Sequence, residues 1–206
     1  MRVIPLSIIV ILLFTLVNCK PSLDTRTTPE VSQEVTSFQQ MMLAEINFAR
    51  TDPAGYAESR LKIAVDDSLD NGSFAYMKGK TPLLPLSFNY ALNLSASNYA
   101  LFLAQKDLMG HNQNGTPLKR AITFGFIGSS VGENIAASSG DYYNSILDPQ
   151  TAAVNFVRIM IIDAGIEDLG HRRTMLNPIY TTIGIGFSRN PASTFVNYNV
   201  QDYGNL

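Results

Sequence analysis

The sequence predicts a single domain of the α+β class behind an N-terminal export segment. In three separate stretches, apolar residues recur at spacings of three and four, which is the period of amphipathic helices. Towards the C-terminus, apolar residues instead alternate with small or polar ones, as in strands with one buried face. The length of 206 residues, 46% of them apolar and 16% charged, is sufficient for one domain with a substantial core.

The chain begins with an apolar segment typical of a signal peptide. Residues 3–17 are apolar apart from Pro5, Ser7 and Thr15, and this run is too short for a comfortable membrane span. Residues 16–19 (Leu-Val-Asn-Cys) resemble a bacterial lipobox, in which the cysteine is acylated and becomes the first residue of the mature protein. We therefore predict a lipoprotein signal peptide over residues 1–18, lipidation at Cys19, and a polar tether over residues 19–30.

The alternative is an ordinary secretory signal with an incidental cysteine. Cys19 is the only cysteine of the chain, so it cannot form a disulfide within one molecule. Because a secreted protein that used cysteine for structure would need pairs, this count favours lipidation.

The helices are predicted from apolar stripes and from their end signals. Residues 28–30 (Thr-Pro-Glu) have the form of an N-cap with proline at the first helical position, and the stripe that follows continues to Ala49. A short helix follows Asp52, a second long helix begins at Ser87 and ends at Gly110, and a short one covers residues 116–122. A third long helix follows an Asp-Pro cap at 148–149. Residues 66–85 show no sustained period and are predicted to form a loop at the rim of the site.

Three strands are predicted, over residues 131–136, 182–187 and 194–201. In the second of them, bulky residues alternate with Gly184 and Gly186. Glycine inside a strand is costly unless another part of the molecule approaches the backbone closely. We therefore expect a packed helix or a cavity over the glycine face of this strand.

Three side chains that could bind a metal ion lie in separate turns and strands. His111 follows the second long helix, Glu133 lies inside an apolar strand, and His171 lies on a glycine-led turn before the 182–187 strand. Two imidazoles and a carboxylate are the ligands of many zinc sites. Each residue also has a structural explanation, because a histidine can interact with the last carbonyls of a helix or lie on the surface, and a buried carboxylate needs a partner such as a histidine or Arg172. Arg172 and Arg173 are themselves predicted to be solvated charges or helix-terminal caps.

The residues around these three side chains resemble a known family. Residues 110–112 (Gly-His-Asn), 132–135 (Gly-Glu-Asn-Ile), 170–173 (Gly-His-Arg-Arg) and 176–178 (Leu-Asn-Pro) are similar, in this order and at these distances, to the bacterial branch of the CAP superfamily. That superfamily, also called the SCP domain, groups cysteine-rich secretory proteins, antigen 5 and pathogenesis-related 1 proteins. The resemblance covers about residues 38–204, and it implies a three-layer α-β-α sandwich with a central antiparallel sheet, here within residues 31–206.

The resemblance also implies a cleft with two histidines and two acidic residues. His111, Glu133 and His171 match three of these positions, and in some members the histidines bind a divalent metal ion such as zinc. The family's second acidic residue lies on the helix before the second histidine, about three residues after an aromatic, and no acidic residue follows Phe156 at that distance. The acidic residues closer to His171 are Asp163, Glu167 and Asp168.

Two functions are predicted. The chain has 15 basic and 17 acidic residues and no cationic cluster, which excludes nucleic acid as a partner. The first prediction is a membrane-anchored lipoprotein of the bacterial cell envelope, periplasmic or surface-exposed, whose cleft binds a small molecule, a lipid, or a host or envelope partner, with or without a divalent metal. The alternative is a metal-dependent hydrolase, in which His111 and His171 hold zinc or another divalent ion and Glu133 is the general base. The missing helix acid favours binding.

Overall fold

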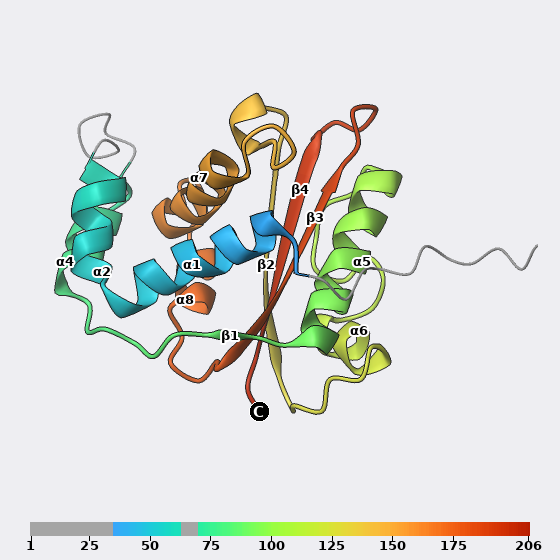
Figure 1. Cartoon of the computed structure of the whole chain (residues 1–206), viewed down its shortest axis with the longest axis horizontal. Helices are drawn as coiled ribbons and strands as arrows, with labels where there is room; N and C mark the ends of the chain where they lie inside the picture. The colour runs from blue at the N-terminus through green and yellow to red at the C-terminus, as the bar shows by residue number, and fades with distance from the viewer. Residues whose placement is uncertain (1–34, 63–69) are drawn as a thin grey trace, which may run out of the picture. The chain divides into compact units, whose positions relative to one another are not determined.

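The structure is a computed structural model that describes residues 35–62 and 70–206 (Figure 1). The predicted signal peptide, Cys19 and the tether lie outside the described residues, as does the predicted start of the first helix at residues 28–30. Within the described ranges, no helix combines the length and the apolar character that a membrane crossing requires.

Along the described chain, groups of helices are separated by single strands, and two consecutive strands end the domain. The helices are α1 (Ser37–Thr51), α2 (Pro53–Tyr56), the π-helical turn η1 (Ala57–Leu61), α4 (Ser73–Gly79), α5 (Tyr90–Lys106), α6 (Pro117–Thr123), the 3-10 turn η2 (Asp141–Tyr143), α7 (Pro149–Ile162) and α8 (Gly170–Met175). The strands are β1 (Ser87–Phe88), β2 (Val131–Ser138), β3 (Thr182–Arg189) and β4 (Asn197–Gly204).

The strands form one sheet in the order β1-β3-β4-β2. Strands β3 and β2 both pair antiparallel with β4, and the short β1 pairs parallel with β3. Helices α5 and α6 cover one face, while α1, α7 and α8 lie on the other (Figure 1). The α-β-α sandwich is therefore confirmed, and its central sheet is mixed rather than wholly antiparallel because of the two-residue edge strand β1.

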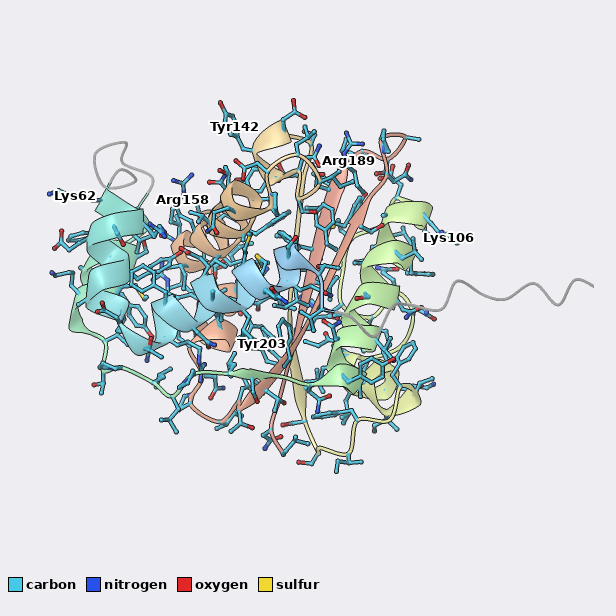
Figure 2. All side chains as sticks on the ribbon, in the orientation of Figure 1. Lys62, Lys106, Tyr142, Arg158, Arg189 and Tyr203 are labelled. Carbon is cyan, nitrogen blue, oxygen red and sulfur yellow. The ribbon has the colours of Figure 1, made fainter. Side chains whose placement is uncertain are left out.

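A packed helix covers the glycine face of β3, which is one of the two explanations that the alternation in the sequence predicts. A Cβ atom on Gly184 would collide with the backbone of Leu92, and one on Gly186 with the backbone of Ala96, both in α5. Helix α5 thus lies directly on the strand. The bulky residues of β3 point the other way, into the core formed with α1 and α7. That core also includes Tyr203 of β4, which is fully buried (Figure 2).

Local hydrogen bonds set most helix starts. Thr36 and Gln39 form a capping box at the start of α1. Asn89 caps α5, which begins at Tyr90 rather than at the predicted Ser87, because Ser87 and Phe88 are used in pairing with β3. The predicted Asp-Pro start of α7 is confirmed, with Asp148 accepting a hydrogen bond from the Thr151 amide.

Other sequence-based boundaries are also wrong for local reasons. Helix α5 ends at Lys106 rather than at Gly110, because Asp107 already adopts the left-handed region. The predicted loop at 66–85 contains helix α4, in whose first turn the Phe74 amide donates to Asp70 and whose Met77 is fully buried. Seven residues give too few turns for a period to be visible in the sequence. The last strand begins at Asn197 rather than at Thr194, because Thr194 donates from its amide and its hydroxyl to Asp107 and remains in the preceding turn.

Candidate functional site

The first histidine lies in the loop that follows α5. Asp107 ends the helix in the left-handed region (φ 53°) and Gly110 adopts φ 125°, a value that favours glycine. The Tyr99 hydroxyl donates to the Gly110 carbonyl and accepts from the Gln113 amide, which fixes the loop on the helix. His111 is held over strand β2, where its Nδ1 lies 2.8 Å from Oε1 of Glu133.

Glu133 is a buried carboxylate with both oxygens occupied. Its side chain is only 1% exposed; Oε1 contacts His111 and Oε2 accepts from Nη2 of Arg120. Arg120 also donates to the carbonyls of His111 and Gly115, and its guanidinium lies 3.4 Å from the centre of the Tyr99 ring. The cation that this carboxylate requires is therefore Arg120 of α6, and not Arg172.

The second histidine lies on α8 and not on an irregular turn. The expectation of a turn is wrong because Leu169, in the left-handed region (φ 53°), is followed at once by six helical residues. The His171 Nδ1 lies 2.6 Å from Oδ1 of Asp163, whose other oxygen accepts from the Arg172 amide. Asp163 is the C-cap of α7 and its side chain is fully buried. Of the three acidic residues near His171, Asp163 is thus the one that contacts the ring.

The prediction that Arg172 and Arg173 are solvated charges or helix-terminal caps is confirmed, with a different alternative at each residue. Arg172 is 3% exposed and donates to the carbonyls of Ile161, Ile162 and Asn71. Burial lowers the pKa of Arg172, and the nearby Asp163 charge opposes this effect. Its guanidinium satisfies the last carbonyls of α7 and fixes α8 against that helix. Arg173 is exposed and forms a surface ion pair of 3.3 Å with Asp168.

The three predicted residues converge on one pocket at the β2 edge of the sheet. This pocket has a volume of about 280 Å³ and is lined by His111, Glu133, Ile166, Asp168, Gly170, His171 and Thr174. A second pocket of about 210 Å³ shares Ile166 and His171 with it. This neighbour is mainly apolar and follows β2 and the end of α7, with Met109, Ile135, Ala137, Ile159, Met160 and Ala164 among its lining residues. We call the two pockets together the cleft.

A further buried carboxylate lies beside Glu133. Asp202 is the neighbour of Glu133 on β4, and its Oδ2 accepts from the Ser95 hydroxyl at 2.7 Å. Complete burial raises the pKa of Asp202 well above its usual value, and the negative charge of Glu133 raises it further.

Sequence reasoning missed Arg120 and Asp202 as parts of the site. The one signal for Arg120 is that an acidic residue in an apolar strand needs a cation, and Arg120 lies between His111 and Glu133 in the chain. Nothing in the sequence indicates Asp202, because its position opposite Glu133 depends on the strand register.

Similarity to known proteins agrees with this architecture. The sequence profile of the cysteine-rich secretory protein family, CAP, matches residues 43–203. The chain belongs to the CAP family. No curated protein matches it. Among solved structures, an outer surface protein of Borrelia burgdorferi matches this CAP chain at 17% identity with a TM-score of 0.51, over 84% of this chain and 95% of that one.

Two further structures are similar to this CAP chain. BmVAL-1 matches at 16% identity with a TM-score of 0.50, over 84% of this chain and 79% of that one. An extracellular protein with an SCP domain from Bacillus anthracis matches at 18% identity with a TM-score of 0.45; it covers 60% of this chain, which spans only 35% of that protein. At these identities the likenesses concern the fold.

The donor groups of this CAP domain suit a divalent metal ion with two protein ligands. Each histidine has its Nδ1 on a buried carboxylate, the arrangement that orients metal-binding imidazoles in proteins. Within residues 35–62 and 70–206, no three His, Cys, Asp or Glu side chains are grouped so that they could hold a metal ion. Catalytic zinc sites have three protein ligands, and the two histidines alone supply one fewer than that.

Proposed function

We propose that this chain is a ligand-binding CAP protein, anchored at the bacterial cell envelope through a lipid on Cys19. Its cleft receives a small molecule, a lipid, or a segment of a host or envelope partner. The observation that supports binding most directly is the pairing of each imidazole with its own buried carboxylate. His111 Nδ1 contacts Glu133 and His171 Nδ1 contacts Asp163, so both Nε2 atoms remain available for a ligand or for zinc.

The state of Glu133 favours binding over hydrolysis. A general base must reach the water molecule from which it takes a proton. The Glu133 side chain is 1% exposed, and its two oxygens already contact His111 and Arg120. Glu133 therefore acts as a positioning residue for the His111 ring, and in this geometry it does not act as a base.

The lining of the cleft favours a ligand with one polar end and one apolar end. The histidine pocket offers ring nitrogens to a polar or metal-bound group, while the adjoining pocket of about 210 Å³ offers apolar side chains of β2 and α7. A divalent ion held by His111 and His171 would supply a positive charge to which an acidic group of the ligand could bind. The two pockets share His171, so one molecule can occupy both.

The histidine geometry is tested by nuclear magnetic resonance of the two imidazole rings. The chain has only two histidines, so both rings can be assigned in an untagged sample by single substitutions. We expect a proton on Nδ1 of each ring, where it is hydrogen-bonded to a carboxylate, and parallel shifts of both Nε2 signals when zinc is added at pH 7.5. Rings with the proton on Nε2, or a zinc-dependent shift at only one ring, would contradict the proposal.

Calorimetry tests the ligand set itself. We expect zinc to bind with a dissociation constant below about 1 mM. Replacing His111 or His171 with alanine should abolish this binding, and Glu133→Gln should weaken it by about ten-fold because the ring loses its orienting partner. Asp168→Asn is the matched control, since Asp168 lines the pocket without contacting either ring. Equal zinc affinities in the wild type and the histidine variants would exclude His111 and His171 as the ligands of the metal.

The envelope anchor has its own test. Wild-type protein expressed in a bacterium with a lipoprotein pathway should partition into the detergent phase of a two-phase extraction, because an acyl chain contributes about 0.8 kcal/mol for each buried CH₂ group. Cys19→Ser should partition into the aqueous phase. If both proteins enter the aqueous phase after export, the secretory alternative is correct.

A further inference from the structure

A second cavity lies on the other face of the sheet, between α5 and α6. Its volume is about 510 Å³, larger than either pocket of the cleft and within the range of about 300–1,000 Å³ typical of small-molecule sites. We call it the α5–α6 cavity. Its apolar lining includes Leu101, Phe102 and Phe124, and its neutral polar lining includes Asn98, Gln105 and Asn114.

The apolar wall of this cavity packs against a buried aromatic residue of the same helix. Phe102 stacks on Tyr99, with ring centres 6.0 Å apart and an angle of 9° between the rings. Tyr99 is 1% exposed, and its other contacts are the Arg120 guanidinium and the Gly110 carbonyl. The wall is therefore preformed, which reduces the ordering cost of binding.

The charged lining of the cavity is entirely cationic. Lys119 and Arg120 line it, and none of its lining residues is acidic. Arg120 is 7% exposed and uses its Nη atoms on Glu133 and two carbonyls, while its buried Nε has no hydrogen-bond partner within the described chain. Lys119 is exposed and forms no ion pair with any described residue. An anionic group would thus find one available ammonium beside an apolar wall.

We propose that the α5–α6 cavity binds a small amphipathic anion, a carboxylate on an aliphatic chain, with the carboxylate at Lys119 and the chain against Leu101, Phe102 and Phe124. The neutral amides at the rim donate hydrogen bonds to the carboxylate. This site is separate from the cleft and requires no metal ion. The anion on its aliphatic chain belongs either to a free medium-chain acid or to an anionic phospholipid, whose phosphate would then lie at Lys119.

A tryptophan reporter can follow this binding directly. The chain has no tryptophan, and Leu101 is 45% exposed on the cavity wall, so Leu101→Trp places a single indole there with little effect on folding. With decanoate below its micelle concentration, we expect a saturable blue shift of the indole emission. Calorimetry with the wild-type chain should give the same affinity within about three-fold.

Charge and location are tested by matched variants. Lys119→Gln in the reporter background should weaken decanoate binding by about ten-fold, because a hydrogen bond to a charged group is lost. Lys106→Gln is the control, since Lys106 lies at the end of α5 and does not line the cavity (Figure 2). His171→Ala should leave decanoate affinity unchanged, which separates this site from the cleft. Decanol should bind more weakly than decanoate.

The proposal is overturned by any of three results. These are the absence of a saturable signal, equal losses of affinity in Lys119→Gln and Lys106→Gln, and loss of decanoate binding in His171→Ala. Phosphatidate with decanoyl chains distinguishes the two sources of the anion: tighter binding than decanoate indicates an anionic lipid, and weaker binding indicates a free acid.

Discussion

Arg120 and Glu133 form the buried ion pair on which the position of His111 depends. Both side chains are at most 6% exposed, so neither charge can be stabilised by bulk water. Removing only the cation leaves a buried carboxylate without compensation, and changes of this kind typically cost about 3–5 kcal/mol. We therefore predict that Arg120→Met lowers the free energy of unfolding by about 3 kcal/mol in urea titrations.

The double variant identifies the cause of this loss. Arg120→Met combined with Glu133→Gln should be more stable than Arg120→Met alone, because the uncompensated charge is gone. If the second substitution destabilises the protein further, the loss in Arg120→Met comes from packing on Tyr99 and not from the carboxylate.

Asp202 should make the stability of the fold depend on pH. Burial raises its pKa in the folded state above the unfolded value of about 3.8, so the folded chain retains a proton that the unfolded chain releases. The stability from this group is fully present below about pH 4 and is lost as the pH rises towards the folded pKa. Asp202→Asn cannot ionise, and we predict that it is more stable than the wild type at pH 7.

The measurement is the free energy of unfolding at pH 4, 5, 6 and 7. The advantage of Asp202→Asn should grow with pH over this window. Asp107→Asn should show no such trend over this window, because hydrogen bonds from Thr194 lower the Asp107 pKa from about 3.8 and its contribution is lost only as the pH falls below about 4. A constant difference between Asp202→Asn and the wild type would mean that Asp202 is not protonated in the fold.

The histidines and the glutamate of the cleft can be predicted from the sequence, but most of the side chains that pair with them cannot. His111, Glu133 and His171 could be identified because each lies in a short run that resembles a family motif. Asp163 was one of three candidate acids, and the choice depends on the left-handed end of α7, which no sequence period reveals. For Arg172 the sequence predicts either a solvated charge or a helix-terminal cap, and it cannot decide between them because only the fold brings the last carbonyls of α7 to this side chain.

At the scale of elements, the contact between β3 and α5 is the feature that the sequence predicted best. The glycines of β3 allow the α5 backbone to lie on the strand, and an added methyl group at Gly184 would collide with the backbone of Leu92. We predict that Gly184→Ala lowers the free energy of unfolding by about 2–3 kcal/mol, because the helix must move away from the sheet.

A glycine outside this contact provides the control. Gly79 ends α4, has no atom within 4 Å of its hypothetical Cβ, and does not adopt a positive φ. Gly79→Ala should be neutral or slightly stabilising, since alanine has the higher helix propensity. If both variants lose equal stability in urea, the loss comes from glycine flexibility and not from the α5 contact.

The two short helices α4 and α8 were not predicted, and the reason is the same for both. Helices α4 and α8 have seven and six residues, so neither gives a stripe that can be distinguished from a loop. Both are fixed by tertiary contacts instead, α4 by its buried Met77 and α8 by Arg172 and the Asn134 amide, which donates to the His171 carbonyl. The second histidine is therefore positioned by an element that only the folded chain defines.

At the scale of the whole molecule, the fold has to be stable without disulfides. Cys19, the only cysteine, lies outside the described domain, and stability must come from the apolar layers on the two faces of the sheet. Residues 31–206 form one compact unit, and a domain of this size buries roughly 70% of the surface of its unfolded chain. We predict that a chain starting at Val31 unfolds in one cooperative transition.

Thermal unfolding followed by circular dichroism measures this in the chain starting at Val31, which has no cysteine, and in the full-length chain with and without a thiol reductant. The melting temperature should be the same in both conditions within about 1 °C, because a disulfide of typical strength would contribute about 2–4 kcal/mol and shift it by several degrees. A gradual transition in the chain starting at Val31, but not in the full-length chain, would mean that residues 1–30 stabilise the domain. A reductant-dependent transition in the full-length chain alone would point to a dimer joined through Cys19, and would also exclude a thioether-linked lipid at that sulfur.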